Sequence, residues 1–358
     1  MQDQLQDDIH ESSDVLYERL HIVVDKGQDP IRIDKFLVAR IEGASRTKVQ
    51  KAIDAGMVTI NGKAISSNYK IKPGEEIIVF SEFEPHRDEI VPQQMDLNIV
   101  YEDHDVMILN KPVGLVVHPG SGNRDHTLVN GIAWYLQQKD KSITEEVLPR
   151  FGLVHRIDKN TSGLMVLAKT DKAAASLAKQ FFDHTVHRYY IALVWGDIKQ
   201  DEGTVIAHVG RHQRFRKLFD AYPEGDHGKE AITHYKVLER FGYVTLIQCE
   251  LETGRTHQIR VHMKFLGHPL FNDEIYGGDR IVKGTVFTKY KQFVDNCFAL
   301  CPRHALHAKT IGFRHPGTGE LVKFDSDLPD DMKLVIEKWR GYSKRAGDQT
   351  VAHPEQEN

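Results

Sequence analysis

The pattern of apolar and polar positions first predicts a pair of short helices followed by a β-hairpin. Two sets of apolar residues have the spacing of a helix face: Ile33, Phe36, Leu37 and Ile41, then Val49, Ala52 and Ile53. Ser45 is placed to cap the second helix and Gly56 to close it. A strand at 57–60 runs into the turn signal Asn61-Gly62, and another strand is predicted at 76–80. Together these elements predict a small helix–hairpin domain.

From about residue 97 the pattern alternates short apolar strands with a few amphipathic helices. The strands are predicted at 98–101, 106–110, 164–169, 189–195, 232–241, 244–251 and 306–313, and the helices at 172–184, 256–266 and 331–339. Several neighbouring strands are joined by tight polar turns, whereas parallel strands need long crossovers. We therefore expect an α+β fold with a mainly antiparallel, mixed sheet in this region.

Changes in composition divide the chain into the small domain, the larger region and the segments around them. A chain of 358 residues is long enough for about two domains. The segment after residue 80 contains two prolines, many charges and little periodicity, as a linker does. We expect a flexible acidic N-terminus at 1–30, the small domain at 31–80, a linker at 81–96, the catalytic domain at 97–340 and a flexible tail at 341–358.

The net charge of −4 conceals a basic block inside an acidic chain. Residues 1–14 carry five acidic residues and no lysine or arginine, whereas residues 31–72 carry nine lysines and arginines against three acidic residues. A compact positive block is typical of a surface that binds a polyanion such as nucleic acid. On charge alone, a solvated basic face explains the block equally well.

The small number of cysteines and the lack of long apolar runs bear on the cellular compartment in which the protein is expected. Three cysteines cannot form a disulfide framework in a chain of this length, which favours a reducing compartment. Cys297 and Cys301 are four residues apart, but two thiols alone make a poor zinc site, and we expect no metal. We find neither a transmembrane stretch nor a secretory signal, so we expect a cytoplasmic protein that does not bind membranes.

Common catalytic motifs are missing from the sequence. It contains no GxxxxGK[ST] loop, no GxGxxG after a strand, no GxSxG elbow and no HExxH. Their absence argues against the usual nucleotide hydrolases, dinucleotide enzymes and zinc peptidases.

The most informative segment is GLVHRIDKNTSGLMVLAKT at 152–170. Asp158 lies in its polar loop, between Arg156 and Lys159 and just before an apolar strand. Nearby positive charge keeps a carboxyl group ionised, and an ionised carboxylate can act as a nucleophile or a general base. Taken alone, such an aspartate more often caps its own turn.

A second segment, ETGRTHQIRVHMKFLG at 252–267, supplies a partner for this carboxylate. Arg255 precedes an amphipathic helix, and Arg260 lies on it. An arginine in apolar surroundings needs an acidic partner, and Asp158 is the most plainly placed one. In the strand at 189–195, Tyr189 and Tyr190 point to opposite faces, so only one of them can line the same cleft.

The small basic domain resembles the S4-type RNA-binding module. The resemblance rests on RIDKFL from Arg32, on Ala44-Ser45-Arg46 and on VQKAIDAGMVTINGK. It implies that Arg46, Lys48 and Lys51 face RNA phosphates. Contacts of this kind position a protein on RNA without reading the base sequence.

The larger region resembles the RluA-type pseudouridine synthases. Four motifs occur in the family's order: VMILNKPVGLVVHPG, then GLVHRIDKNTSGLMVLAKT, then TGRTHQIRVHMKFLGHPLFND, and finally HALHAKTIGFRHPGTGE. The resemblance implies that Asp158 is the catalytic aspartate, that Tyr190 is the active-site tyrosine and that Arg260 pairs with Asp158. It also implies that Arg156 occupies the gap left by a flipped base, and we expect Arg255 to contact RNA as well.

The resemblance implies isomerisation of uridine to pseudouridine in structured RNA, with large-subunit ribosomal RNA as the expected substrate. We expect a monomer that acts without a cofactor and flips its target base into a pocket. One alternative is a non-catalytic RNA-binding factor in ribosome assembly, although such a clamp would not need Asp158, Tyr190 and Arg260 together. A glycosidase would need a second carboxylate about 5–10 Å from the first, and none is obviously matched to Asp158.

Overall fold

The computed structural model describes residues 17–41, 44–81, 90–120, 123–215, 218–285 and 287–351. By its internal contacts the chain splits into two compact units, Met1–Asp88 and Glu89–Asn358. The first sixteen residues, half of the expected linker and the end of the expected tail lie outside the described residues. Within the described ranges, no helix is long and apolar enough to cross a membrane.

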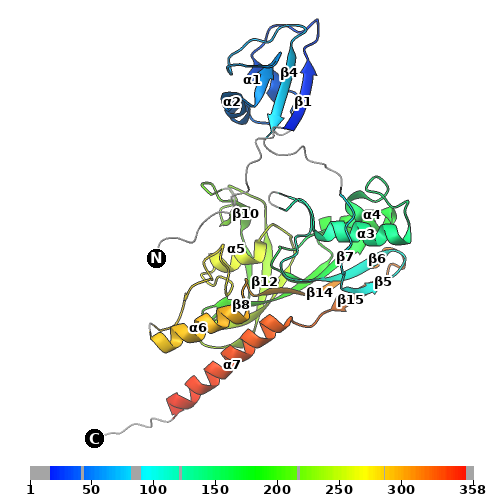
Figure 1. The fold of residues 1–358 in the computed structure, drawn as a ribbon. Helices are drawn as coiled ribbons and strands as arrows, with labels where there is room; N and C mark the ends of the chain where they lie inside the picture. The colour runs from blue at the N-terminus through cyan, green and yellow to red at the C-terminus, as the bar shows by residue number, and fades with distance from the viewer. Residues whose placement is uncertain are drawn as a thin grey trace. The chain divides into compact units, whose positions relative to one another are not determined.

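The first unit is a helix pair packed on a four-stranded antiparallel sheet (Figure 1). Its elements are β1 (Tyr17–Val23), α1 (Ile33–Val38), α2 (Arg46–Asp54), β2 (Val58–Ile60), β3 (Lys63–Ala64) and β4 (Glu76–Ser81), and the strand order is β1-β4-β2-β3. The side chain of Ser45 accepts the Lys48 N–H at 3.4 Å, so the predicted cap is confirmed. Asn61 and Gly62 both have positive φ and join β2 to β3, as predicted.

Strand β1 was not predicted, because its residues were assigned to a flexible N-terminus. It pairs with β4 from Tyr17 to Val23 and covers that strand's second edge. Its sequence mixes charged and apolar residues without strict alternation, so the periodicity that identifies a half-buried strand is weak there. The ordered unit therefore begins well before residue 31.

The second unit is built on one large sheet of nine strands. Its path is β5-β6-β7-β14-β8-β13-β12-β9, with β15 beside β14. The strands are β5 (Ile99–Glu102), β6 (Val106–Lys111), β7 (Ser162–Ala168), β8 (His187–Trp195), β9 (Glu202–Ile206), β12 (Ile232–Arg240), β13 (Val244–Leu251), β14 (Leu306–Arg314) and β15 (Leu321–Asp325). Every pairing along this path is antiparallel except that of β7 with β14, which confirms a mainly antiparallel α+β fold.

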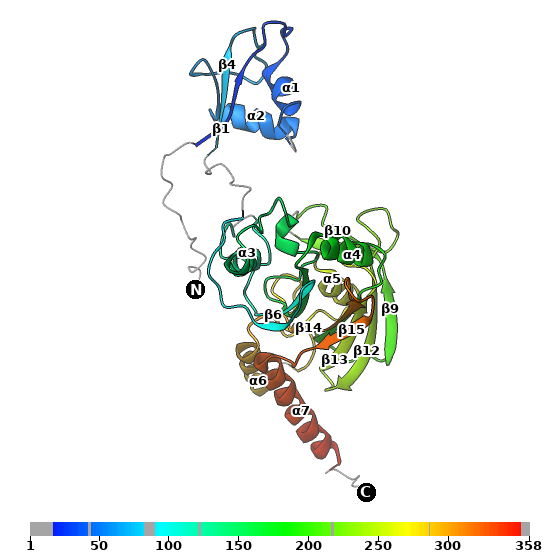
Figure 2. The same ribbon diagram turned by 90° about the vertical axis from the view of Figure 1, so that its right-hand side faces the viewer.

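Helices cover both faces of this sheet, because successive strand residues point to opposite sides. One face packs against α3 (Leu128–Lys139) and α5 (Gln258–Phe265). The other packs against α4 (Asp171–Phe182) and against α6 (Thr288–Leu300) with α7 (Asp330–Val351). Figure 2 shows α6 and α7 lying side by side. A short hairpin, β10 (His208–Arg211) and β11 (Phe219–Tyr222), stands apart from the main sheet.

Helix α7 is longer than predicted, since it continues to Val351 instead of ending at Trp339. Its extension carries Tyr342, whose ring stacks on Phe293 of α6 at 4.5 Å, and Arg340, which forms an ion pair with Glu239 at 2.7 Å. The Tyr342 contact supports helical structure in a part of the chain that was expected to be a flexible tail. The helices α3 and α6 were not predicted either.

Candidate active site

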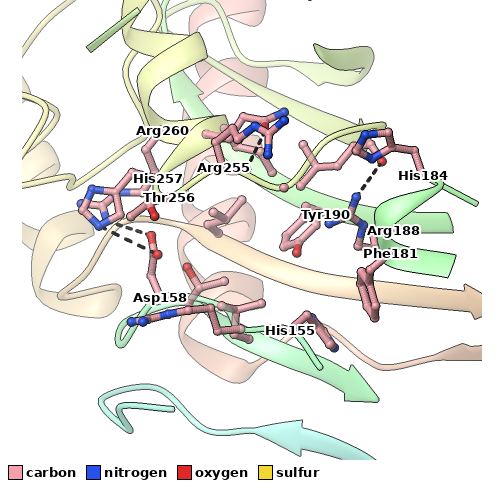
Figure 3. A pocket seen from close by; sticks show the side chains of 18 of the residues that line it. His155, Asp158, Phe181, His184, Arg188, Tyr190, Arg255, Thr256, His257 and Arg260 are labelled. Carbon is pink, nitrogen blue, oxygen red and sulfur yellow. Dashed lines mark hydrogen bonds and ion pairs between the residues drawn. The ribbon is translucent and has the colours of Figure 1, made fainter. Parts of the chain in front are cut away.

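A cavity of about 490 Å³ brings together the three residues that were expected to carry the chemistry (Figure 3). Asp158 comes from the loop before β7, Tyr190 from β8 and Arg260 from α5. The strands β7, β14 and β8 are successive neighbours in the sheet, and β13 follows β8 and leads into α5. The order of strands in the sheet therefore assembles a site from residues that are about a hundred positions apart in the sequence.

Arg260 is buried between two carboxylates. Its Nη1 donates to Oδ2 of Asp158 at 2.9 Å, which confirms the predicted contact. Its Nε and Nη2 donate to the two oxygens of Asp273 at 2.8 and 2.9 Å. A bidentate pair of this kind fixes the plane of the guanidinium, so Asp273 aims Nη1 of Arg260 at Asp158.

A second carboxylate, Asp273, which the sequence did not single out, lies on the other side of the same guanidinium. Asp273 is 0% exposed, and its Oδ1 also accepts the backbone N–H groups of Ile275 and Tyr276 at 3.1 and 3.2 Å. Since both of its oxygens are already bonded, Asp273 cannot serve as the second, substrate-facing carboxylate of a glycosidase. Its role is to position Arg260.

The carboxyl group of Asp158 is held in its ionised form. Burial alone raises the pKa of such a group, and the Asp158 side chain is only 22% exposed. The charge of Arg260 and the nearby rings of His257 and His304 outweigh burial, so the pKa of Asp158 lies below its usual value. The cavity wall thus presents a carboxylate able to act as a nucleophile or general base.

His257 faces Asp158 from a strained part of the backbone. It precedes α5 in the left-handed conformation, with φ of 57° and ψ of 19°, which residues other than glycine rarely adopt. Its Nδ1 lies 2.7 Å from the Tyr276 hydroxyl, and its Nε2 lies 3.9 Å from Oδ1 of Asp158. Burial lowers the pKa of His257, which favours a neutral imidazole beside the carboxylate. His257 was not among the site residues expected from the sequence.

Tyr190 provides an aromatic wall of the cavity. It is 7% exposed and lines the same space as Asp158, whereas Tyr189 points to the other side of the sheet, where Lys323 lies 5.6 Å from its ring. The prediction that only one of the two tyrosines lines the cleft is confirmed. Burial raises the pKa of Tyr190, so its phenol stays protonated at neutral pH.

Two further arginines expected to bind RNA lie at the cavity. Arg156 is exposed and lines both this cavity and a neighbouring one of about 410 Å³ on the other side of Asp158. Arg255 is half-buried, and its Nε donates to the backbone oxygen of Glu230 at 2.9 Å. Their positive charges border the carboxylate, where a polyanion would approach it.

Lys111 supports the Asp158 loop from beneath. It is 1% exposed, and its Nζ donates to the backbone oxygens of Pro112, Leu115 and Lys159 at 2.7, 3.0 and 2.9 Å. Burial lowers the pKa of Lys111 to about 7, while these three acceptors match the three protons of an ammonium group. The residue ties the end of β6 to the backbone next to Asp158.

Lys111→Met is expected to destabilise the protein by about 3 kcal/mol, because it removes three hydrogen bonds from a charged group and leaves the backbone oxygens of Pro112 and Leu115 without that donor, whereas the Lys159 oxygen keeps the N–H of Gly114. Lys159→Met is the matched control: the Lys159 side chain is exposed and its backbone oxygen is unchanged, so stability should shift by less than about 0.5 kcal/mol. Urea unfolding followed by circular dichroism measures both. Equal stability of the two variants would show that Lys111 does not support the loop.

In the first unit, the three residues expected to face RNA differ in their surroundings. Lys48 and Lys51 are exposed on α2. Arg46 is about half exposed, and its Nε donates to the buried carboxylate of Asp34 at 2.9 Å. Arg32 shares that carboxylate. Arg46 therefore has a structural partner in addition to any contact with RNA, which the sequence pattern did not indicate.

Neither the described carboxylates and histidines nor the cysteines form an obvious metal site. Among the residues that the structure describes, no group of three or more His, Cys, Asp or Glu side chains is arranged to hold a metal ion. Cys297 and Cys301 are buried at the end of α6, and burial raises the pKa of each to about 12. Thiols in such surroundings stay protonated and make poor metal ligands.

Comparison with known proteins identifies families that match both units. The sequence model of the RNA pseudouridylate synthase family matches residues 105–265, and that of the S4 domain matches residues 31–77. An RNA pseudouridine synthase of Chlorobaculum parvum is 44% identical over 88% of this chain and 96% of its own length. The ribosomal large subunit pseudouridine synthase D of Nitrosomonas europaea is 38% identical over 87% of this chain and 85% of its own length.

Among solved structures, the human RNA pseudouridylate synthase domain containing 4 protein has a similar fold. It superposes with a TM-score of 0.54 at 21% identity and covers 68% of this chain and 93% of its own. At this level of identity the likeness concerns the fold alone.

Proposed function

Since the chain belongs to the RNA pseudouridylate synthase family and is an RNA pseudouridine synthase with an S4 domain, we propose that it modifies large-subunit ribosomal RNA with Asp158 as its catalytic carboxylate. The observation that carries the proposal is the ionised carboxylate of Asp158, held at 2.9 Å by Arg260 and facing the cavity that Tyr190 lines. Of the two carboxylates that Arg260 binds, only Asp158 is available to substrate, because Asp273 is fully buried.

The reaction needs a nucleotide outside the helix stack. A base in a stem is inaccessible, so the target uridine is flipped into the cavity at the expense of its stacking and pairing. Tyr190 gives the uracil a flat surface to stack on, and Arg156 is placed to fill the space that the base leaves. Arg156 and Arg255, beside the carboxylate, bind the flanking phosphates.

The isomerisation exchanges bonds within a single nucleotide. The bond from C1′ to N1 breaks with its electron pair on the uracil, the ring turns, and a bond from C1′ to C5 forms. The proton on C5 is lost and N1 gains one, so the isomerisation involves no net oxidation or reduction and no outside nucleophile enters the product. Asp158 can attack C1′, attack C6, or assist formation of a glycal, and each route requires it ionised next to the flipped nucleotide.

Ribosomal RNA is the substrate that the relatives and the charge distribution favour. Several relatives at 38–41% identity are named ribosomal large subunit pseudouridine synthase D. The exposed lysines Lys48 and Lys51 on α2 would hold phosphates of a structured RNA, together with the free edge of Arg46.

Mapping of pseudouridines in total RNA from cells with and without the gene tests the proposal. We expect one or more sites in large-subunit ribosomal RNA to disappear in the deletion strain. Purified protein should restore the same sites on an unmodified transcript and release tritium from C5-labelled uridine. Sites lost only from transfer RNA would refute the choice of substrate but not the activity.

Removing residues 1–85 is expected to weaken binding to long structured RNA while catalysis on a saturating short substrate persists. The deletion removes the basic block and leaves Asp158, Tyr190 and Arg260 in place. Lysine and arginine contacts release phosphate counterions, so the slope of log affinity against log salt should become shallower by about 2 if three contacts are lost. Titrating both proteins against one RNA at several salt concentrations measures the slope. An unchanged slope would show that the first unit does not bind RNA.

A further inference from the structure

Arg188 is a buried cation in the active-site cavity that the mechanism above does not use. It lies in β8 and is only 7% exposed, yet it lines the same cavity as Asp158. Its Nη2 donates to the backbone oxygens of Leu251 and Glu252 at 3.4 and 3.1 Å. Its Nε is buried without a hydrogen-bond partner in the described part of the chain.

Among the described residues, no acidic side chain forms an ion pair with this cation. None of the ion pairs formed by the described residues includes Arg188, whereas Arg260 in the same cavity is bonded to two carboxylates. The ring of Phe181 lies 5.5 Å from its Cζ, and Tyr190 interacts with it electrostatically. His155 stacks on that phenylalanine, and burial with the charge of Arg188 lowers the pKa of His155 to about 3. An unbalanced buried charge is costly, so a site that retains one is prepared for an anion from outside.

Gly254 leaves the space that the guanidinium occupies. A Cβ added to Gly254 would lie 2.7 Å from Nη1 of Arg188, closer than such atoms approach. The φ of Gly254 is not in the left-handed region, so its backbone does not demand glycine. The small residue therefore leaves room for the guanidinium, and an alanine at this position would require that end of the Arg188 side chain to shift.

The position of Arg188 relates it to the bound nucleotide. It precedes Tyr190 by two residues on one strand, so both side chains leave the same face about 7 Å apart. Figure 3 shows Tyr190 between Asp158 and Arg188. A uracil stacked on Tyr190, with its ribose at Asp158, would therefore bring its far edge or a flanking phosphate toward Arg188.

We propose that Arg188 binds an anionic oxygen of the flipped nucleotide. This inference rests on the proposed function. The oxygen has two possible sources with the same chemistry. One is O2 or O4 of the uracil, which share the electron pair that N1 keeps when its bond to C1′ breaks. The other is a phosphate beside the target uridine. A guanidinium fixed where this charge is present or develops needs no rearrangement during the reaction.

The experiment compares Arg188→Met with Arg188→Lys, because both lose the arginine's hydrogen-bond geometry and only the lysine keeps the charge. Turnover is measured by tritium release from transcripts of large-subunit ribosomal RNA, and affinity by titration of the same RNA. Arg188→Met should lose about 10-fold to 100-fold in one readout, the range for a hydrogen bond to a charged group. Arg188→Lys should stay within about threefold of the unaltered protein. Gly254→Ala, which displaces the guanidinium, should lose activity in the same readout.

The readout that changes identifies the source. A lower kcat with unchanged RNA affinity identifies the uracil oxygen. A weaker RNA affinity identifies a phosphate. Replacing that phosphate by a neutral methylphosphonate should then lower the RNA affinity of the unaltered protein but not that of Arg188→Met. Tyr189→Phe, on the opposite face of the same strand, is the matched control and should behave as the unaltered protein.

Equal losses in the methionine and lysine variants, or no loss in either, would overturn the proposal, since the side chain would then act only by packing. Thermal unfolding of each variant separates such losses from misfolding. The RNA-affinity comparison remains possible if the unaltered protein releases no tritium from any transcript. That result would refute the proposed function, and a methionine-specific loss of affinity would still support the anion site.

Discussion

Asp158→Asn is expected to abolish pseudouridine formation, with a loss of at least about 1000-fold in turnover, while the fold and RNA affinity are retained. The amide keeps the size of the carboxylate and can still accept the hydrogen bond that Arg260 Nη1 donates to it. It loses the negative charge on which attack at C1′, attack at C6 and glycal formation all depend. Tritium release from C5-labelled RNA measures turnover, and titration measures affinity.

Asp279→Asn is the matched control for this result, because Asp279 is exposed and lies outside the cavity. Its turnover should equal that of the unaltered protein. If Asp158→Asn kept activity within about tenfold, the carboxylate would not be the catalytic group. The roles proposed for Tyr190 and Arg260 beside it would then be wrong as well.

Arg260→Met is expected to lower both activity and stability. The change leaves Asp273 buried without its cation, and breaking a buried ion pair in this way costs about 3–5 kcal/mol. Beside His257 and His304, Arg260 is one of the groups that lower the pKa of Asp158, and its removal leaves the burial that raises this pKa less opposed. The pKa of Asp158 therefore rises, and the acidic limb of the pH–rate profile moves to higher pH.

A second substitution separates the two effects of Arg260→Met. Adding Asp273→Asn removes the uncompensated buried charge, so the double variant should regain much of the lost stability without regaining activity. Urea unfolding measures stability and tritium release at several pH values measures activity. An acidic limb that stays in place in Arg260→Met would show that the guanidinium does not keep Asp158 ionised.

The central pair of the site could be predicted because the physical constraint on it is severe. A charged side chain in apolar surroundings must have a partner, and Arg260 and Asp158 were the plainest candidates on either side. The second partner of Arg260, Asp273, could not be predicted in the same way. Arg260 has donors for two carboxylates, but the sequence does not show how the segment with Asp273 turns back toward α5. The sequence likewise does not show that β8 places the Arg188 side chain in the cavity, because this depends on how the sheet is assembled.

Short sequence signals predict the structure where a turn depends only on its own residues, and they do not where contacts with distant segments determine the conformation. Asn61-Gly62 forms the hairpin turn that this dipeptide favours. Asn130-Gly131 carries the same signal but lies inside α3. There the Asn130 side chain accepts the N–H of Thr127 at 3.0 Å in a capping box, and a Cβ on Gly131 would lie 2.8 Å from the Met95 side chain. The glycine permits a close approach of a distant segment, which local pattern cannot reveal.

The strand that closes the middle of the large sheet is also one of the last to be synthesised. β14 pairs with β7 on one side and β8 on the other, and its residues begin at Leu306. Until translation has passed this strand, β7 and β8 each have an open edge, and such edges pair readily with other chains. Asp158 and Tyr190 meanwhile belong to separate half-sheets. A nascent or prematurely ended chain therefore has no assembled site and exposes surfaces that a chaperone would need to shield, so RNA modification begins only after nearly the whole protein has left the ribosome.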